Sequence, residues 1–363
     1  MRSWLKSYVL AAAAALPMMA ATAFAQQYTQ TNLVSDLANQ GAVTVDPNLK
    51  NAWGLARSAS SEWWVNSEGT GTSNLYDGQG HIFASLPEVT IPTASGTGTA
   101  TPTGIIFNGS QDFDLVAGNA STAAPFIFAT ADGTISAWNP AVKPTTAVIK
   151  VNESARKAIF GGLTWAVIDG RHFLFAPNFH SGAVETFDAD FTRVGDFAES
   201  PVRGFAPYNV QAVGANIIVT YAEQNSAKTL AVEGTGKGFV IVYDLRGRAV
   251  TSLQNGPWFN APWGVALAPQ DFGTFSHALL IANRGSGTIA AFNPTTGQFL
   301  GNMLDASGKT LVISNLWGIE FGNGQTAGSP LSLYFSAGIN NYQDGLFGTL
   351  TPVAAELDAE DHE

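Results

Sequence analysis

The stretch APWGV at residues 261–265 recurs along the chain with small changes. Each copy has a small residue, Gly or Asn, at its fourth position, and successive copies are spaced by 50, 58, 47, 55 and 54 residues. The copies are NAWGL (51–55), TPTGI (101–105), IFGGL (159–163), APYNV (206–210), APWGV (261–265) and NLWGI (315–319). A period of about 50 residues is typical of four-stranded propeller blades, so the repeat predicts six blades.

The residues after each copy also repeat. In the fifth unit the phrase is followed by HALLIANRGSG, TIAAFNPTTG and QFLGNML, which indicate three more short strands with turns between them. In five units the third strand closes with an aromatic residue followed by Asp or Asn, whose side chain can start a turn. These pairs are Tyr76-Asp77, Trp138-Asn139, Phe187-Asp188, Tyr243-Asp244 and Phe292-Asn293.

The two ends of the chain complement each other. The sixth unit stops after GLFGTLTP without a fourth strand, while QYTQTNLVSDL at 27–37 precedes the first phrase as a spare strand. If the spare strand fills the last blade, the ring closes and no sheet edge is left free. The sequence therefore predicts an all-β, six-bladed propeller of four-stranded blades, with the N-terminal strand closing the last one.

Residues 1–25 have the pattern of a signal peptide. Two basic residues precede an Ala-rich apolar run, which ends in Ala-Phe-Ala before Gln26. A membrane anchor is the alternative, but the run is short and interrupted by Pro17. We expect cleavage after Ala25, a secreted or periplasmic protein without a membrane span in the mature chain, a propeller over 26–355 and an acidic tail over 356–363.

Composition limits the partners. The chain has no Cys, so a secreted fold would depend on its core alone, and thiolate metal sites are excluded. After removal of residues 1–25 there would be 15 basic against 28 acidic residues, which argues against nucleic acid as a partner. We expect a monomer whose partner is an unidentified extracellular protein, glycan or small molecule.

Within the repeated phrase, each residue type has an expected structural role. Pro stiffens the approach to the innermost strand, the aromatic residue wedges between blades, and Gly lets the backbone turn in the crowded centre. Packing alone would explain the three tryptophans of the phrase, Trp53, Trp263 and Trp317.

The phrase, the strand units and the N-terminal closure resemble the NHL-type six-bladed propellers. More closely, the chain resembles a family of secreted bacterial proteins of unknown function, some of which carry a PEP-CTERM sorting signal. The segments that carry this resemblance are NLVSDL, NAWGL, LWGIEFGNG and GLFGTLTP. The chain departs from the pattern by ending in LDAEDHE, without a Pro-Glu-Pro motif. The resemblance implies the fold but no activity.

In a propeller, the loop that enters the inner strand and the loop that leaves the second strand lie on one face around the channel. We predict that this is the binding face. It would include the following residues: Trp53, Asp132, Asn209, Trp263, Arg284 and Trp317. With no catalytic signature in the sequence, the favoured hypothesis is an extracellular binding module.

The alternative is a Ca²⁺-dependent hydrolase or lyase, similar in design to six-bladed lactonases of the gluconolactonase type. Carboxylate and amide oxygens suit a hard cation. Glu68, Glu223, Asn178 and Asn283 are the candidate ligands, and His180 is the candidate for proton transfer. The alternative without a metal site is that the Asn residues form turns and that His180 is an ordinary surface residue. A quinone-dependent oxidoreductase lacks support because basic residues are few.

Overall fold

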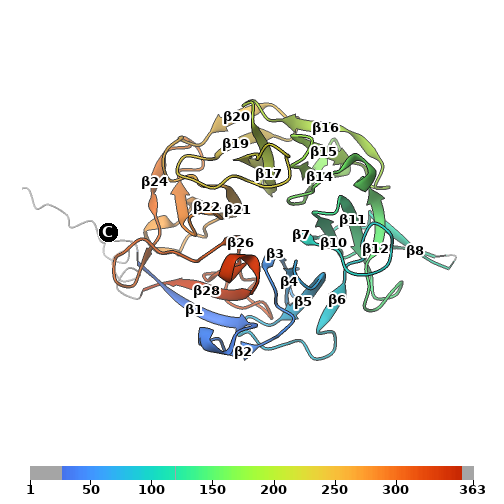
Figure 1. The fold of residues 1–363 in the computed structure, drawn as a ribbon, viewed down its shortest axis with the longest axis horizontal. Helices are drawn as coiled ribbons and strands as arrows, with labels where there is room; N and C mark the ends of the chain where they lie inside the picture. The colour runs from blue at the N-terminus through green and yellow to red at the C-terminus, as the bar shows by residue number, and fades with distance from the viewer. Residues whose placement is uncertain (1–26, 119, 354–363) are drawn as a thin grey trace, which may run out of the picture.

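The structure is a computed structural model that describes residues 27–118 and 120–353. Six sheets stand around a central axis like the blades of a propeller (Figure 1). The predicted fold class is thereby confirmed. The predicted signal peptide and acidic tail lie outside the described residues and stay predictions.

Five blades follow one another in sequence, each with its first strand innermost. Blade 1 consists of β3 (Ala52–Ala56), β4 (Trp63–Ser67), β5 (Thr72–Tyr76) and β6 (Glu88–Thr90). Blade 2 consists of β7 (Pro102–Phe107), β10 (Phe126–Thr130), β11 (Thr134–Trp138) and β12 (Val148–Asn152). Blade 3 consists of β13 (Thr164–Ile168), β14 (Arg171–Asn178), β15 (Ala183–Phe187) and β16 (Arg193–Glu199). Blade 4 consists of β17 (Phe205–Val213), β18 (Asn216–Glu223), β19 (Phe239–Asp244) and β20 (Ala249–Ser252). Blade 5 consists of β21 (Pro262–Leu267), β22 (Leu279–Asn283), β23 (Ile289–Phe292) and β24 (Phe299–Asn302).

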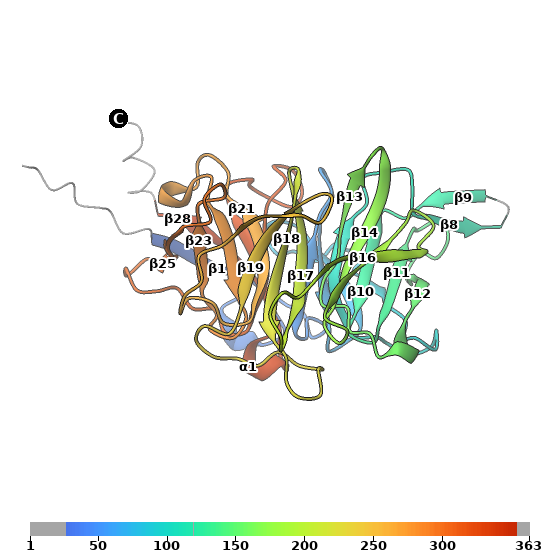
Figure 2. The same cartoon turned by 90° about the horizontal axis from the view of Figure 1, so that it is seen from above.

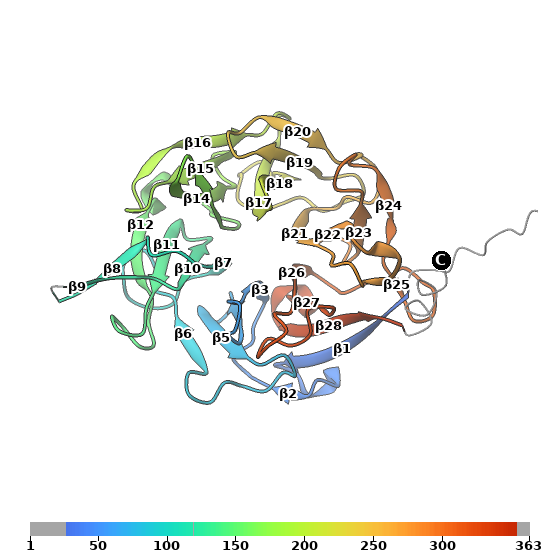
Figure 3. The same cartoon turned by 180° about the vertical axis from the view of Figure 1, so that it is seen from behind.

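Blade 6 is built from both ends of the chain, as predicted. It contains β26 (Leu316–Phe321), β27 (Leu333–Ala337), β28 (Leu346–Pro352) and the N-terminal β1 (Gln27–Ser35). β1 and β28 are antiparallel, with a register from Tyr28 opposite Pro352 to Ser35 opposite Leu346, and they lie side by side in Figure 3. The short β2 (Thr44–Val45) and β25 (Leu304–Asp305), which the sequence did not predict, each pair with β1 in parallel.

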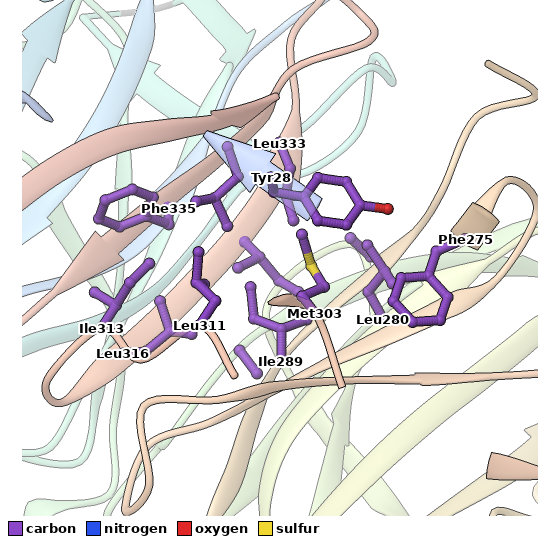
Figure 4. Close-up of a cluster of buried hydrophobic side chains, with 14 of the residues drawn as sticks. Tyr28, Phe275, Leu280, Ile289, Met303, Leu311, Ile313, Leu316, Leu333 and Phe335 are labelled. Carbon is purple, nitrogen blue, oxygen red and sulfur yellow. The ribbon is translucent and has the colours of Figure 1, made fainter. Parts of the chain in front are cut away.

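The closing strand is fixed by its side chains as well as its backbone. Tyr28 is fully buried in a cluster formed by blades 5 and 6, beside Met303 and Leu333 (Figure 4). Its hydroxyl donates a hydrogen bond to the Phe272 carbonyl at 3.0 Å. The N-terminal strand therefore joins two blades, since apolar burial and a satisfied hydroxyl act together.

The predicted turn-forming Asp and Asn residues are confirmed. Asp77 Oδ1 accepts the backbone N–H groups of Gln79 and His81 at 2.8 and 2.9 Å. Asp188, Asp244, Asn139 and Asn293 accept backbone N–H groups in the same way. The turns after the third strands are thus set locally, which explains why the sequence alone indicated them.

The glycines of the repeated phrase are required for a different reason from the one expected. None of them has a positive φ. Instead, a Cβ on Gly54 would lie 2.2 Å from the Thr103 carbonyl oxygen of the next blade. A Cβ on Gly264 would lie 2.4 Å from the Trp317 carbonyl oxygen. Neighbouring inner strands approach too closely for a side chain, because six of them converge on one axis.

Seen from the side, the two faces of the ring differ in their loops (Figure 2). The loop between β18 and β19 and the short turn α1 (Ile339–Tyr342) project from one face. A hairpin of β8 (Asp114–Ala117) and β9 (Ala120–Ala123) extends sideways from blade 2. Three short 3-10 turns complete the described elements: Ala38–Gln40, Ser154–Arg156 and Gly273–Phe275. Within the described residues, no helix has the length and apolar character to span a membrane.

Candidate functional site

The inner strands run in the same direction, so their first residues meet at one end of the channel and their last residues at the other. At the end where they begin lies a cavity of about 260 Å³, which we call the aromatic mouth. Its walls include Trp53, Tyr208, Trp317 and Tyr342, with Arg284 among them. The predicted face therefore carries a cavity.

Three tryptophans of the repeated phrase form the floor of this mouth. The rings of Trp53 and Trp317 are stacked with centroids 3.5 Å apart, and Trp263 stands edge-on to Trp317 at 5.9 Å. Trp263 Nε1 donates to the Gly161 carbonyl of blade 3 at 2.8 Å. The Trp53–Trp317 stack thus joins neighbouring blades 1 and 6, while the Trp263 hydrogen bond reaches from blade 5 to blade 3.

A backbone feature common to three blades precedes these rings. Asn51, Ala261 and Asn315 each lie two residues before a Trp, and their φ values are 46°, 48° and 54°. Such left-handed conformations are uncommon outside Gly, although Asn tolerates them. The described residues show this feature in blades 1, 5 and 6, which are the blades whose phrase contains Trp.

Arg284 is the centre of a polar network at the rim. It is 8% exposed, and its guanidinium lies 5.2 Å from the Trp317 ring centroid. Nε donates to the Tyr342 hydroxyl and Nη1 to the Tyr208 hydroxyl, both at 2.8 Å, while Nη2 donates to Glu233. The buried cation is thus paired with a carboxylate, and each of its three nitrogens donates a hydrogen bond, which offsets the cost of its burial.

Tyr342 reaches this network through an unusual turn. Asn340, Asn341 and Tyr342 have φ values of 52°, 54° and 67° within α1. Left-handed backbone is unfavourable for a tyrosine, and local strain of this kind is found at functional sites. Two hydrogen bonds of the Tyr342 hydroxyl offset this strain: it donates to Glu233 Oε1 at 2.7 Å and accepts from Arg284.

Both phenols stay protonated at neutral pH. Burial raises the pKa of Tyr342 to about 12, against the opposing effect of Arg284. Burial also raises the pKa of Tyr208, again opposed by Arg284. Tyr208 accepts from Arg284, and within the described residues its own O–H has no acceptor. A donor is therefore available in the wall of the cavity.

A second polar chain connects the floor to the rim. Trp317 Nε1 donates to Asn51 Oδ1, and Asn51 Nδ2 donates to Glu68 Oε2, both at 3.0 Å. Glu68 lines the cavity and is half-buried. In the described part of the chain, Trp53 Nε1 is buried without a hydrogen-bond partner. The mouth thus combines aromatic walls, a carboxylate acceptor and unused donors.

The four predicted metal ligands have different surroundings. Glu68 lines the cavity, whereas Glu223 forms an ion pair with Lys237 at 3.4 Å. Asn178 and Asn283 are buried, and their Oδ1 atoms accept backbone N–H groups at 3.0 to 3.2 Å.

The two amides therefore act as turn formers. Within the described residues, one oxygen of each carboxylate, Glu68 and Glu223, has no hydrogen-bond partner. Among the described residues, no group of three His, Asp or Glu side chains is arranged to hold a metal. The calcium site stays a prediction.

The other predicted residues are on or near the same face. His180 follows the cavity-lining Phe179, and its Nδ1 lies 3.3 Å from the Lys228 carbonyl oxygen. Asp132 is next to the lining residue Ala131, and its carboxylate accepts from Thr101. Proton transfer by His180 stays a prediction.

Asn209, predicted for the binding face, contacts the inner strands on either side and lines the cavity at the opposite end instead of the aromatic mouth. It is buried, and its Nδ2 donates to the Trp263 carbonyl at 2.8 Å. Its Oδ1 would lie 1.9 Å from a Cβ on Gly162. Asn209 thus bridges blades 3, 4 and 5 where the repeat departs from Gly.

Sequence reasoning missed three residues of the mouth: Tyr208, Glu233 and Tyr342. Tyr208 occupies the position of the tryptophans in the phrase APYNV, which was a usable signal. Glu233 and Tyr342 lie in the loops between the second and third strands of blades 4 and 6, which are longer than the same loops of the other blades. The repeat could not indicate them, because it carries information only on what the blades share.

Comparison with known proteins agrees with the fold. No family model matches the chain. An uncharacterized protein of Acanthamoeba polyphaga mimivirus is 28% identical over 333 residues, covering 88% of this chain and 78% of the viral protein. The resemblance to bacterial proteins with a PEP-CTERM signal is thus not supported by this relative, which is viral.

Two solved structures are similar in fold. A Bacteroides thetaiotaomicron protein of unknown function has a TM-score of 0.55 at 10% identity, covering 90% of this chain and 76% of its own. A Xanthomonas campestris gluconolactonase has a TM-score of 0.50 at 11% identity, covering 84% of this chain and 87% of its own. At such low identity the likeness extends to the fold alone.

Proposed function

We propose that the protein is an extracellular binding module whose aromatic mouth takes a neutral sugar ring. The carrying observation is the combination of the Trp53–Trp317 stack with an unused Tyr208 donor and the Glu68 acceptor in one cavity. A sugar ring has an apolar face for an aromatic side chain and hydroxyls that donate and accept. Small-ligand sites have this composition, with mostly apolar walls and a few placed polar groups.

The charges of the mouth favour a neutral ligand over an anion. Arg284 is already neutralised by Glu233, and its guanidinium is covered by Trp317 and Tyr342. Glu68 adds an uncompensated negative charge, since within the described residues it has no cationic partner. An anionic ligand would therefore meet repulsion without a free cation.

The test is a fluorescence titration of the folded protein with neutral oligosaccharides of glucose, galactose and N-acetylglucosamine. We expect saturable quenching of tryptophan emission, and at least tenfold weaker binding after Trp53→Ala, equivalent to about 1.4 kcal/mol. Trp258→Ala is the matched control, because this half-buried ring stacks on Phe299 at 3.9 Å outside the cavity. Equal affinity of both variants for the sugar would exclude the aromatic mouth as the binding site.

Export is a separate part of the proposal. It is supported by the apolar N-terminal run before Gln26. N-terminal sequencing of the protein recovered outside the cytoplasm should begin at Gln26. Recovery of the full-length chain inside the cell would contradict it.

The second candidate is a cation-dependent hydrolase or lyase. The observation that favours it is the position of Glu68 in the cavity wall. Within the described residues, its carboxylate accepts a single side-chain hydrogen bond, from Asn51. A cation that binds only the folded state would raise stability by ~2.7 kcal/mol at a hundredfold excess over its Kd. A Ca²⁺-dependent rise in Tm, reversed by EDTA and lost in Glu68→Gln, would support a lactone and ester screen. An unchanged Tm would eliminate this candidate.

A further inference from the structure

The opposite end of the channel has a different chemistry. Here the inner strands end, and two adjoining cavities of about 240 and 280 Å³ share Arg57, Gln211 and Glu320 in their walls. We call this end the polar mouth. The aromatic floor separates it from the aromatic mouth, since Trp263 borders this side and Trp53 borders the other.

Glu320 and Gln211 have unused hydrogen-bonding capacity. In the described part of the chain, neither side chain makes a hydrogen bond, and Glu320 Oε1 lies 3.8 Å from Arg57 Nε as a loose ion pair. The Glu320 side chain is 37% exposed because it borders the cavity. A structural carboxylate would accept several hydrogen bonds, so this one is available to a ligand.

Arg57 is fixed by its Nε and its stacking contact, but its terminal nitrogens have unused hydrogen-bond donors. Its Nε donates to the Phe321 carbonyl at 2.7 Å, and its guanidinium lies 5.9 Å from the Trp63 ring centroid. Nη1 makes one long contact with the Ser58 carbonyl at 3.5 Å, and Nη2 makes none within the described residues. The terminal nitrogens can therefore bind a carboxylate.

Part of the wall is apolar. Ile105 lines both cavities, and the second cavity extends to Phe107 and Trp165. Trp165 Nε1 is satisfied by the Phe107 carbonyl at 3.0 Å, so its ring offers apolar surface alone. A positive group, a negative group and an apolar wall thus border one small space.

We propose that the polar mouth binds a free apolar α-amino acid, with its ammonium on Glu320, its carboxylate on Arg57 and its side chain against Ile105 and Trp165. A simple cation would be repelled by Arg57 and a simple anion by Glu320, whereas a zwitterion satisfies both. The cavities are smaller than the range typical of drug-sized ligands, which favours a small molecule. The site is independent of the sugar proposed for the aromatic mouth.

Binding should depend on pH. Burial raises the pKa of Glu320 to about 7, although Arg57 opposes this shift. Arg57 is the charged group that faces Glu320 among the described residues. The carboxylate is the form that pairs with an ammonium, so affinity should increase from pH 5.5 to pH 7.5 while the ligand keeps its charges.

Isothermal titration calorimetry with L-leucine and L-phenylalanine tests this site in the intact protein. We expect at least tenfold weaker binding of the N-acetylated and the methyl-ester forms, each of which lacks one charge. Glu320→Gln should also weaken binding at least tenfold and abolish its pH dependence, while Glu62→Gln on the same chain should do neither.

Three results would overturn the proposal. The first is no heat from either amino acid at millimolar concentration with wild-type protein that melts cooperatively. The second is equal affinity for the free and the N-acetylated forms. The third is unchanged pH dependence in a folded Glu320→Gln variant, which circular dichroism would verify.

Discussion

The two ends of the channel begin from the same six inner strands and yet differ in chemistry. At the aromatic mouth, the positive charge of Arg284 is paired with the Glu233 carboxylate. Its guanidinium also contacts two phenol hydroxyls and the face of a tryptophan ring. At the polar mouth, Glu320 and Arg57 face each other at 3.8 Å with unused hydrogen-bonding capacity. The difference shows that the arginine of the aromatic mouth is already paired closely within the protein, while the charged pair of the polar mouth keeps hydrogen-bonding capacity for a ligand.

Removal of the aromatic floor should have the largest effect. Trp317 is 2% exposed and contacts Trp53, Trp263 and Arg284. We expect Trp317→Ala to lower the free energy of unfolding by about 3–5 kcal/mol, because a large cavity would open between the two mouths. Urea denaturation followed by circular dichroism measures this, with Trp258→Ala as a milder control. A loss below about 1 kcal/mol would mean that the floor does not stabilise the ring.

The second-largest effect is expected from a change to the inner strands, which border both mouths. Gly264→Ala would place a Cβ 2.4 Å from the Trp317 carbonyl oxygen, so the inner strands of blades 5 and 6 must separate. We expect a loss of about 1–3 kcal/mol in unfolding free energy. Gly109→Ala is the matched control, since its Cβ would have its nearest contact at 3.4 Å and its φ is not positive. Equal losses would refute the close-approach explanation.

The charge balance of the aromatic mouth can be broken from the rim. Glu233→Ala leaves Arg284 with two phenol partners but no carboxylate. We expect a loss of about 1–2 kcal/mol, less than for a fully buried pair, because Glu233 is 40% exposed. Chemical denaturation at low and high salt checks this. An unchanged midpoint would show that the hydroxyls alone satisfy the cation.

The smallest effect concerns the polar mouth and pH. The folded-state pKa of Glu320, about 7, lies above the value near 4.3 of an unfolded chain. Stability from this group is therefore full below the unfolded pKa and is lost as pH rises through about 7. We expect Glu320→Gln to remove a decline of less than about 1 kcal/mol between pH 5 and 8, since the Glu320 side chain is 37% exposed and solvent screens its charge. Parallel pH profiles for wild type and variant would contradict the shift.

Most of the fold could be predicted from the sequence because a propeller repeats its local interactions. The Asp and Asn turns, the strand order and the closing strand all depend on neighbours in sequence or on matching chain ends, as for Asp77 and Tyr28. Three residues predicted for the binding face, Trp53, Arg284 and Trp317, line one cavity, and ligand binding at this face stays a prediction. Contacts among the three tryptophans join neighbouring blades, as predicted, but the sequence did not indicate that the three rings would meet in one cluster.

The sequence by itself thus determined the six units and the closure of the ring by the N-terminal strand. Only the tertiary structure decided which side chains share a cavity. Tyr208, Glu233 and Tyr342 come from three separate loops or strands and join at Arg284, and Arg57 meets Glu320 across blades 1 and 6. The physical reason is that a periodic pattern specifies what each blade repeats. A site arises where blades differ, and its contacts link residues far apart in the chain.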